Sequence, residues 1–304
     1  MESFYAHGKL LLTGEYVVLT GAMALAVPTR LGQFLNIDKP EKKNQINWTS
    51  LDQNNNSWFM CSLAGDSLEI IESTASQYSR KLQSILRYLR EENDVFLTMG
   101  ASITTKLEFD RFFGLGTSSS LISLLAQASD VDPYSLNRKA FGGSGYDIAC
   151  ATSNHPIFFK ISSEAPSIEK AKINQSLIDH GHFVYLERKQ NSKEEVLKFD
   201  VNNVSTEIIS AINEITQQLS EPSSYIEMLE LITRHEKIIS HLIGQSMVQQ
   251  KLFKDFWGGI KSLGAWGGDF ILAISNREEI ETKRYFADKG FATSYSFREL
   301  ILIE

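Results

Sequence analysis

A glycine turn that runs directly into a hydroxyl-rich helix start constrains this chain more than any other stretch. The turn is Gly114-Leu115-Gly116, the hydroxyl residues are Thr117-Ser118-Ser119-Ser120, and residues 121–128 form an apolar run typical of a buried helix. Glycine lets a backbone come close to a ligand, and Thr and Ser are good N-cap residues. The free N–H groups of a first helical turn attract anions. The stretch therefore predicts a phosphate-binding loop, with a capped helix after a tight turn as the alternative.

The spacing of apolar residues predicts a mixture of helices and strands. Residues 77–92 repeat apolar side chains at helical spacing, and residues 101–108 alternate as a strand does. Residues 38–57 are polar, so we expect surface loops or a hairpin tip there. Because helices and strands do not alternate strictly, an α+β fold is favoured over a doubly wound sheet. Further helices are expected at 121–128, 136–140, 206–219, 223–243, 247–260 and 278–289, and further strands at 4–7, 9–12, 31–37, 157–161, 183–186, 270–274 and in the last residues.

Length and composition limit the organisation and the partners of the chain. Its 304 residues can form one large domain or two ordinary ones, and a composition shift at residues 162–172 favours domains at 1–165 and 166–304. The net charge of −7 argues against nucleic acid or an anionic membrane as a partner. Two cysteines provide no disulfide framework, and we see neither a signal peptide nor a run long enough to span a bilayer. We therefore expect a cytoplasmic protein.

Three glycine-bearing stretches together resemble one enzyme family. Residues 6–19, 114–119 and 264–269 are similar, in order and spacing, to the three motifs of the small-molecule kinases named for galactose, homoserine, mevalonate and phosphomevalonate (the GHMP kinases). Within that family the likeness is greatest to the phosphomevalonate kinases, because Tyr16 follows Gly14-Glu15 and residues 143–150 resemble their acidic segment.

This resemblance implies a fold and a set of ligands. The fold would be an N-terminal ribosomal-protein-S5-like domain that binds ATP, joined to a ferredoxin-like C-terminal domain. The cofactors would be ATP and Mg²⁺, and Ser118 would help to place the metal ion. The ATP-binding residues would be Gly114, Leu115, Gly116, Thr117, Ser118, Ser119 and Ser120. Residues at the acceptor substrate would be Glu15, Tyr16, Ser144, Gly145, Gly267 and Gly268.

The resemblance also assigns two catalytic residues, Asp147 and Lys9. Phosphoryl transfer depends mainly on positioning and on charge stabilisation. Asp147 is suited to orient the attacking oxygen and to accept its proton, and Lys9 is suited to offset negative charge beside it. The alternatives are that Asp147 is a turn residue after glycines and that Lys9 is a solvated surface charge.

Several residues depart from the family pattern or have ordinary structural explanations. Trp266 stands where the third motif usually has glycine, and the family's metal-binding glutamate has no counterpart near residues 136–140. We expect His235 and His241 to have surface or capping roles, not metal-binding ones. An anionic acceptor would need cationic groups, and the candidates near the motifs are Lys9, Arg30, Arg111, Arg138, Lys139 and Lys261.

Three functions remain open on the sequence alone. The first is an ATP-dependent kinase of a mevalonate-pathway intermediate, with phosphomevalonate preferred and mevalonate next. The second is a sugar or homoserine-type kinase of the same fold, and the third is a ligand-binding member without catalysis. In each case the partners are small molecules, and the chain is a monomer or a homodimer.

Overall fold

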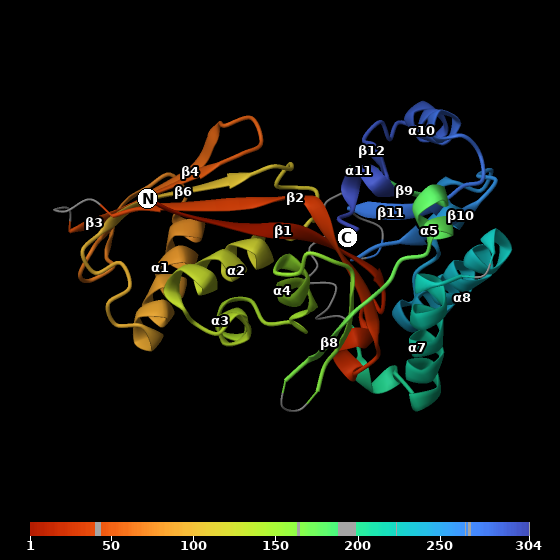
Figure 1. Cartoon of the computed structure of the whole chain (residues 1–304), viewed down its shortest axis with the longest axis horizontal. Helices are drawn as coiled ribbons and strands as arrows, with labels where there is room; N and C mark the ends of the chain where they lie inside the picture. Colours follow the sequence, from red (N-terminus) through yellow and green to blue (C-terminus); the bar gives the residue numbers. More distant parts are fainter. Residues whose placement is uncertain are drawn as a thin grey trace. The chain divides into compact units, whose positions relative to one another are not determined.

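The fold is described by a computed structural model in which the chain forms two compact units (Figure 1). The described residues are 1–39, 44–162, 165–187, 199–222, 224–264, 266 and 269–303. The first unit consists of Met1–Gly8, Leu31–Arg111 and Leu115–Thr152. The second unit consists of Lys9–Arg30, Phe112–Gly114 and the described part of Ser153–Glu304. Each unit draws on several stretches of the chain, and the division into domains 1–165 and 166–304 stays a prediction.

A mixed sheet forms one layer of the first unit. Its strands lie in the order β5-β4-β3-β6-β2, with β1 beside β2. Strand β3 runs parallel to β6, whereas the pairs β2–β6, β3–β4 and β4–β5 are antiparallel. The strands are β1 (Glu2–Thr13), β2 (Ala24–Asp38), β3 (Gln45–Leu51), β4 (Ser57–Ala64), β5 (Ile70–Ser73) and β6 (Ala101–Leu107).

Strand β3 lies within residues 38–57, where the polar composition predicts surface loops or a hairpin tip. That prediction is wrong for Gln45–Leu51, whereas residues 52–56 do form the tip of the hairpin between β3 and β4. The side chains of β3 alternate between buried and half-buried positions, and Ile46, Trp48 and Ser50 form the buried set. A period of two is what a strand with one buried face requires. The alternation, and not the average polarity, decides the structure here.

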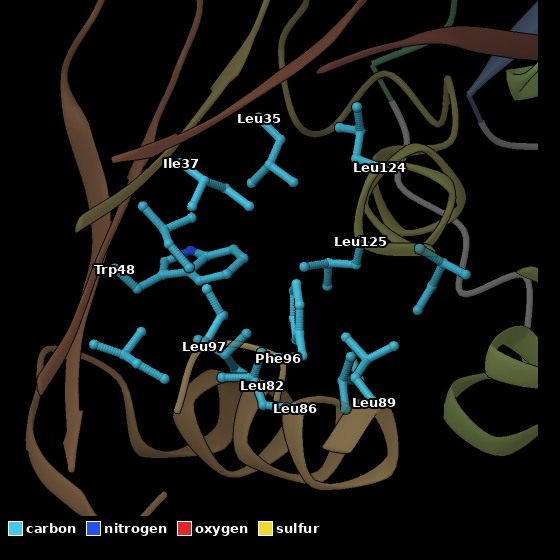
Figure 2. Close-up of a cluster of buried hydrophobic side chains, with 14 of the residues drawn as sticks. Leu35, Ile37, Trp48, Leu82, Leu86, Leu89, Phe96, Leu97, Leu124 and Leu125 are labelled. Carbon is cyan, nitrogen blue, oxygen red and sulfur yellow. The ribbon is translucent and has the colours of Figure 1, made fainter. Parts of the chain in front are cut away.

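The core of the first unit lies between this sheet and the helices α1 and α2 (Figure 2). Leu86 and Leu89 of α1 lie in one cluster with Trp48 of β3 and Leu125 of α2. Because α2 begins directly after the glycine turn, burial of its apolar face holds the end of that turn against the core. The helices are α1 (Ser76–Glu92), α2 (Thr117–Ser129), α3 (Pro133–Ala140) and α4 (Tyr146–Ala151).

A four-stranded antiparallel sheet forms the centre of the second unit. Its strands lie in the order β10-β11-β9-β12. Elsewhere in this unit, β7 pairs with the first residues of β2 and β8 pairs with β7. The strands are β7 (Ile157–Lys160), β8 (Ser167–Lys170), β9 (Gly181–Tyr185), β10 (Gly259–Ser262), β11 (Phe270–Ile274) and β12 (Ser294–Ser296).

The longest helix of the second unit, α8, packs against both α7 and β10. Its helices are α5 (Gln175–His180), α7 (Thr206–Ser220), α8 (Tyr225–Ile243), α9 (Val248–Leu252), α10 (Glu279–Asp288) and α11 (Phe297–Leu300), with short 3₁₀ turns η1 (Val17–Thr20) and η2 (Val201–Asn203). In the part of the chain described here, none of the helices combines the length and the apolar character needed to cross a membrane.

The long periodic helices are confirmed to within two residues, including those predicted at 77–92, 206–219 and 278–289. The single helix predicted at 247–260 is wrong in its second half, because α9 ends at Leu252 and β10 begins at Gly259. A Cβ on Gly258 would lie 1.9 Å from the carbonyl oxygen of Ile274 on the neighbouring strand. This close approach of two backbones needs glycine and favours a strand over a helix.

Candidate active site

The first turn of α2 presents backbone N–H groups that no side chain caps. Gly116 occupies the N-cap position with a left-handed backbone, φ 93°, which glycine adopts at little cost. The N–H of Ser120 donates to the carbonyl oxygen of Gly116 at 2.9 Å, which is the first hydrogen bond of the helix. The N–H groups of Thr117, Ser118 and Ser119 precede that bond and have no side-chain cap. This end of α2 is therefore suited to bind an anion.

The four hydroxyl residues of this turn divide into two pairs. Ser119 and Ser120 are buried, and both hydroxyl groups donate to the carbonyl oxygen of Gly116, at 2.9 and 3.0 Å. The Ser120 hydroxyl also donates to Oε1 of Gln33 at 2.6 Å. Thr117 is half-buried and Ser118 is exposed, and neither hydroxyl has a hydrogen-bond partner among the described residues. Thr117 and Ser118 are therefore the hydroxyls that can reach a ligand, whereas Ser119 and Ser120 shape the turn.

Leu115 lies in the same stretch, and its side chain is fully buried. Only its backbone groups are therefore placed to contact a nucleotide. An exposed hydroxyl such as that of Ser118 suits Mg²⁺, which prefers oxygen ligands and usually keeps phosphate and water oxygens in its shell. Across the described ranges, no three His, Cys, Asp or Glu side chains gather as a metal centre made by protein alone would require.

A second glycine-rich turn, which ends at Gly145, leads into α4 and carries Asp147. The backbone of Gly145 is left-handed, with φ 87°. Asp147 stands in the first turn of α4, half-buried, and its Oδ1 accepts the N–H of Ile148 at 3.1 Å. The Ser144 hydroxyl accepts the N–H of Tyr146 at 3.4 Å. Helices α2 and α4 pack against each other in the first unit, so the fold brings the helices of both turns into contact.

Tyr134 of α3 is a residue of this region that the motifs do not indicate. Its ring lies 3.1 Å from the position that a Cβ on Gly145 would occupy. Burial raises the pKa of Tyr134 to about 12, and the negative charges of Asp132 and Asp147 add to the shift. The phenol therefore keeps its proton at neutral pH, beside the turn that carries Asp147. The only signal in the sequence is the short helix that begins at Pro133, next to Tyr134.

Lys9 and Gly114 come together in the second unit. The ammonium group of Lys9, on β1, donates to the carbonyl oxygen of Gly114 at 3.1 Å. Gly114 has φ 70°, and a Cβ at this position would lie 2.2 Å from Oδ2 of Asp269. Glycine is therefore required at the start of the glycine turn for two independent reasons, its backbone conformation and the space available. The predicted pairing of Lys9 with Asp147 stays a prediction.

Glu15 belongs to a cluster of ionisable residues that is buried in the second unit. Oε1 of Glu15 forms an ion pair with the ammonium group of Lys261, and Oε2 lies 3.3 Å from Nε2 of His235. That Nε2 accepts the N–H of Gly14 at 3.1 Å, so it carries no proton. Glu236 lies on the same helix as His235 and accepts the N–H of Ser262 at 3.1 Å. Every side chain in this cluster is at most 1% exposed.

The electrostatics of this cluster follow from its burial. Burial and the positive charge of Lys261 hold the pKa of His235 well below its usual value, in agreement with the bond that its Nε2 accepts. Burial also raises the pKa of Glu15, against the opposing effect of Lys261. For Glu236, burial raises the pKa to about 8. The imidazole of His235 is therefore neutral at neutral pH, and the ammonium group of Lys261 on Oε1 of Glu15 is the contact that opposes the effect of burial on that carboxyl.

Two expectations from the sequence are corrected here. His235 has neither a surface role nor a helix-capping role, because its ring is buried and binds the backbone of Gly14. Lys261 does not lie open to an anionic acceptor, because it is buried and paired with Glu15. The role of Glu15 at the acceptor substrate stays a prediction, although its carboxylate is engaged inside the unit.

Tyr16 and Trp266 connect the first and third motifs. Tyr16 has φ 64°, an unusual backbone for an aromatic residue, and its hydroxyl oxygen accepts the N–H of Trp266 at 3.2 Å. Trp266 is 1% exposed and packs in a cluster with Val17 and Ile212. The indole therefore lies in the interior of the second unit. Gly267 and Gly268, predicted at the acceptor, lie outside the described residues.

Three of the solved structures that resemble this chain are small-molecule kinases. A phosphomevalonate kinase from Streptococcus pneumoniae, in complex with phosphomevalonate and AMPPNP, aligns over 97% of this chain and 99% of its own, at 17% identity and a TM-score of 0.73. A mevalonate kinase from Methanococcus jannaschii aligns over 100% and 98%, at 14% identity and a TM-score of 0.72. A galactokinase from Lactococcus lactis, complexed with galactose, aligns over 99% and 93%, at 12% identity and a TM-score of 0.70. No family model and no curated protein matches the sequence.

The chain therefore has the fold of the GHMP kinases over nearly its whole length. The resemblance carried by the three motifs is confirmed for the fold, and the mixed α+β class is confirmed with it. Because the sequence identities are only 12–17%, the similarity to these structures establishes the fold alone.

The buried ion pair leads to a prediction about stability. We expect Glu15→Gln to lower the free energy of unfolding by about 3–5 kcal/mol, because it leaves the Lys261 ammonium buried without a counter-charge. Lys261→Met should have a similar effect for the converse reason. The double variant should recover most of the loss, because no unpaired charge remains. Urea denaturation of the unaltered protein, the two single variants and the double variant measures the change in the free energy of unfolding for each variant.

The exposed pair of Arg277, which precedes α10, and Glu281, which lies on α10, provides a matched control, since both of its side chains are nearly half exposed. Removal of either partner there should cost no more than about 1 kcal/mol. If the free energy of unfolding of the Glu15→Gln, Lys261→Met double variant falls by the sum of the two single losses, the pairing of Glu15 with Lys261 is contradicted.

Proposed function

We propose that this protein is an ATP-dependent kinase of the GHMP family that phosphorylates a mevalonate-pathway intermediate, with phosphomevalonate preferred over mevalonate. The observation that carries the proposal is the uncapped first turn of α2, which follows a left-handed Gly116 and presents free N–H groups beside two available hydroxyls. In a chain with the fold of these kinases, that turn corresponds to the stretch that resembles their phosphate loop.

The phosphate loop would bind ATP mainly through its backbone. The N–H groups of Thr117, Ser118 and Ser119 would hold phosphate oxygens, supported by the positive end of the α2 dipole. The Thr117 hydroxyl would add a donor, and the Ser118 hydroxyl would ligate Mg²⁺. ATP supplies the phosphoryl group that is transferred, and Mg²⁺ neutralises its charge. The roles of Ser119 and Ser120 in this scheme are indirect, because their hydroxyls already bind Gly116.

Asp147 and Lys9 would carry the chemistry. Asp147 would orient the attacking oxygen of the acceptor and take its proton, which is the work of a general base. Lys9 would offset negative charge on that oxygen or on the carboxylate, and its bond to the Gly114 carbonyl would also hold it at the start of the phosphate loop.

The finer description of the fold is part of the proposal. The first unit would represent an S5-like domain, with the mixed sheet covered by α1 and α2. The second would represent a ferredoxin-like domain, an assignment supported by the antiparallel order β10-β11-β9-β12 and the packing of α8 against β10. Both cysteines are free and buried, which suits a reducing cytoplasm.

The acceptor would bind beside the turn that leads into α4. Ser144 and Gly145 lie in this turn, and Tyr134 adds a protonated phenol next to it. Phosphomevalonate carries a carboxylate and a phosphate, so it needs cationic groups. Arg138 on α3 is a candidate, since its side chain is 68% exposed and its nearest carboxylate, on Asp132, is 4.0 Å away. A sugar would need uncharged hydrogen-bonding groups instead.

The first prediction from this function concerns Gly116. We expect Gly116→Val to weaken ATP binding at least tenfold, because a β-branched residue cannot easily adopt φ 93° and would distort the first turn of α2. Gly244→Val is the matched control, since Gly244 ends α8 with φ 66° and has open space around it. Calorimetry with Mg²⁺ and AMPPNP measures both affinities. Unchanged affinity in a folded Gly116→Val protein would assign the nucleotide to another place.

The second prediction concerns Asp147. We expect Asp147→Asn to lower kcat by about two to four orders of magnitude with little change in ATP affinity, because the amide cannot accept the proton. Asp130→Asn is the control, since Asp130 is an exposed carboxylate in a left-handed position that Asn also tolerates. A folded Asp147→Asn variant that keeps near-normal turnover would exclude this residue as the base.

The third prediction concerns the acceptor. Purified protein with ATP and Mg²⁺ should turn over phosphomevalonate with a higher kcat/KM than mevalonate, homoserine or hexoses. Added salt should raise the KM for phosphomevalonate, because its binding depends on charge. Preference for uncharged sugars would favour the sugar-kinase alternative, and absence of turnover with the whole panel would favour a member without catalysis.

A further inference from the structure

The three residues directly before Leu115 are each held by a separate contact within the second unit. The Tyr185 hydroxyl donates to the carbonyl oxygen of Phe112 at 3.2 Å. The Phe113 ring packs against the rings of Tyr185 and Phe270, with centroid separations of 4.6 and 5.7 Å. The Lys9 ammonium donates to the carbonyl oxygen of Gly114 at 3.1 Å. These contacts hold the segment against the sheet.

The two aromatic residues that receive Phe113 are themselves paired across the central sheet. Tyr185 of β9 lies opposite Phe270 of β11, and their ring centroids are 5.4 Å apart. The next backbone bond of the same ladder joins the N–H of Leu186 to the carbonyl oxygen of Asp269 at 2.7 Å. Asp269 is the residue whose carboxylate leaves room only for glycine at position 114. Tyr185 of β9 and Phe270 of β11, held opposite each other by the strand pairing, thus form the surface against which residues 112–114 pack, and this surface is called the seat.

We propose that Tyr185 is a positioning residue for ATP binding, which acts through Phe112 and Phe113 on the phosphate loop that follows them. This inference rests on the proposed function. A loop that binds phosphate through backbone N–H groups gains affinity when those groups are already in place, because less conformational entropy is then lost on binding. Residues 112–114 lead covalently into Leu115, so the seat on β9 and β11 limits the conformations open to the loop. Tyr185 touches neither the nucleotide nor the reacting atoms in this role.

The hydroxyl and the ring of Tyr185 make separable contributions. The hydroxyl fixes a backbone carbonyl, whereas the ring packs against Phe113, so Tyr185→Phe removes one contact and keeps the other. Phe113→Leu removes the aromatic contact and keeps the hydroxyl. Each change should increase the fraction of protein with a released loop, and the apparent dissociation constant rises as the competent fraction falls.

The experiment compares Tyr185→Phe with Tyr295→Phe. Tyr295 lies on β12, which pairs with β9, and its ring centroid is 6.4 Å from that of Phe270, so it is a tyrosine of the same sheet without the Phe112 contact. We expect Tyr185→Phe to weaken binding of AMPPNP with Mg²⁺ roughly three- to tenfold, the range of one lost hydrogen bond. The KM for the acceptor and the melting temperature should stay near those of the unaltered protein. Phe113→Leu should weaken nucleotide binding in the same way.

The outcomes separate the inference from the function on which it rests. If the unaltered protein does not bind AMPPNP with Mg²⁺, the proposed function fails and the inference fails with it. If the unaltered protein binds but Tyr185→Phe and Phe113→Leu match Tyr295→Phe, only the positioning role is overturned. If Tyr185→Phe weakens the binding of nucleotide and acceptor equally and also lowers the melting temperature, the role of Tyr185 is merely structural, and the positioning role is overturned.

Discussion

The buried ion pair between Glu15 and Lys261 is the constraint on which the second unit most depends. Two charges without access to water are tolerated best when they meet and when further hydrogen bonds satisfy them. Lys261 also donates to the Ser262 carbonyl at 2.9 Å, and Ser262 in turn binds Glu236, whereas Oε2 of Glu15 and Nδ1 of His235 have no hydrogen-bond partner among the described residues. The neutral His235 holds the backbone of Gly14 beside the pair. Together these bonds fix the turn of the first motif to β10 and α8, and Tyr16, the next residue, reaches Trp266 from that turn.

Local features of the fold could be predicted from the sequence, whereas the buried cluster could not. The helix after Gly116 can be predicted from neighbouring residues, because the apolar spacing of residues 121–128 is a property of a single stretch, although its N-cap is Gly116 and not one of the hydroxyl residues. Lys261, the charged partner of Glu15, lies 246 positions away in the chain. His235 lies within the helical pattern of α8, and nothing in that pattern distinguishes it from other helical residues. A single sequence carries no signal that joins such distant residues. Strand β3 was within reach of the sequence, because its alternation of buried residues is local, but average polarity concealed it.

The same distinction applies inside the glycine turn and the first turn of α2. Four consecutive hydroxyl residues look equivalent in the sequence, yet Ser120 binds Gln33, which lies 87 positions earlier on β2, and Ser118 stays exposed. The direction of each hydroxyl follows from where the apolar face of α2 packs against the core. Tertiary packing therefore decides which of four similar side chains can serve a ligand. Residue type alone predicts the kind of loop, but it does not predict which hydroxyl groups are buried in hydrogen bonds and which are exposed.

The proposed site has a part that binds the nucleotide and a part that binds the acceptor, and the two parts place different demands on the sequence. This difference explains why the fold is recognisable while the three aligned kinases act on different acceptors. Nucleotide phosphates are held by backbone N–H groups and by glycines that permit close approach, and these demands leave most side chains free to change. Identities of 12–17% are compatible with such a site, since Gly114 and Gly116 already have the left-handed backbone that such a turn uses. Acceptor recognition instead depends on charged and polar side chains, which differ between a sugar and a phosphorylated acid. Under the proposed function, the residues that decide the acceptor are therefore to be sought around the turn that carries Asp147, where Tyr134 lies against Gly145.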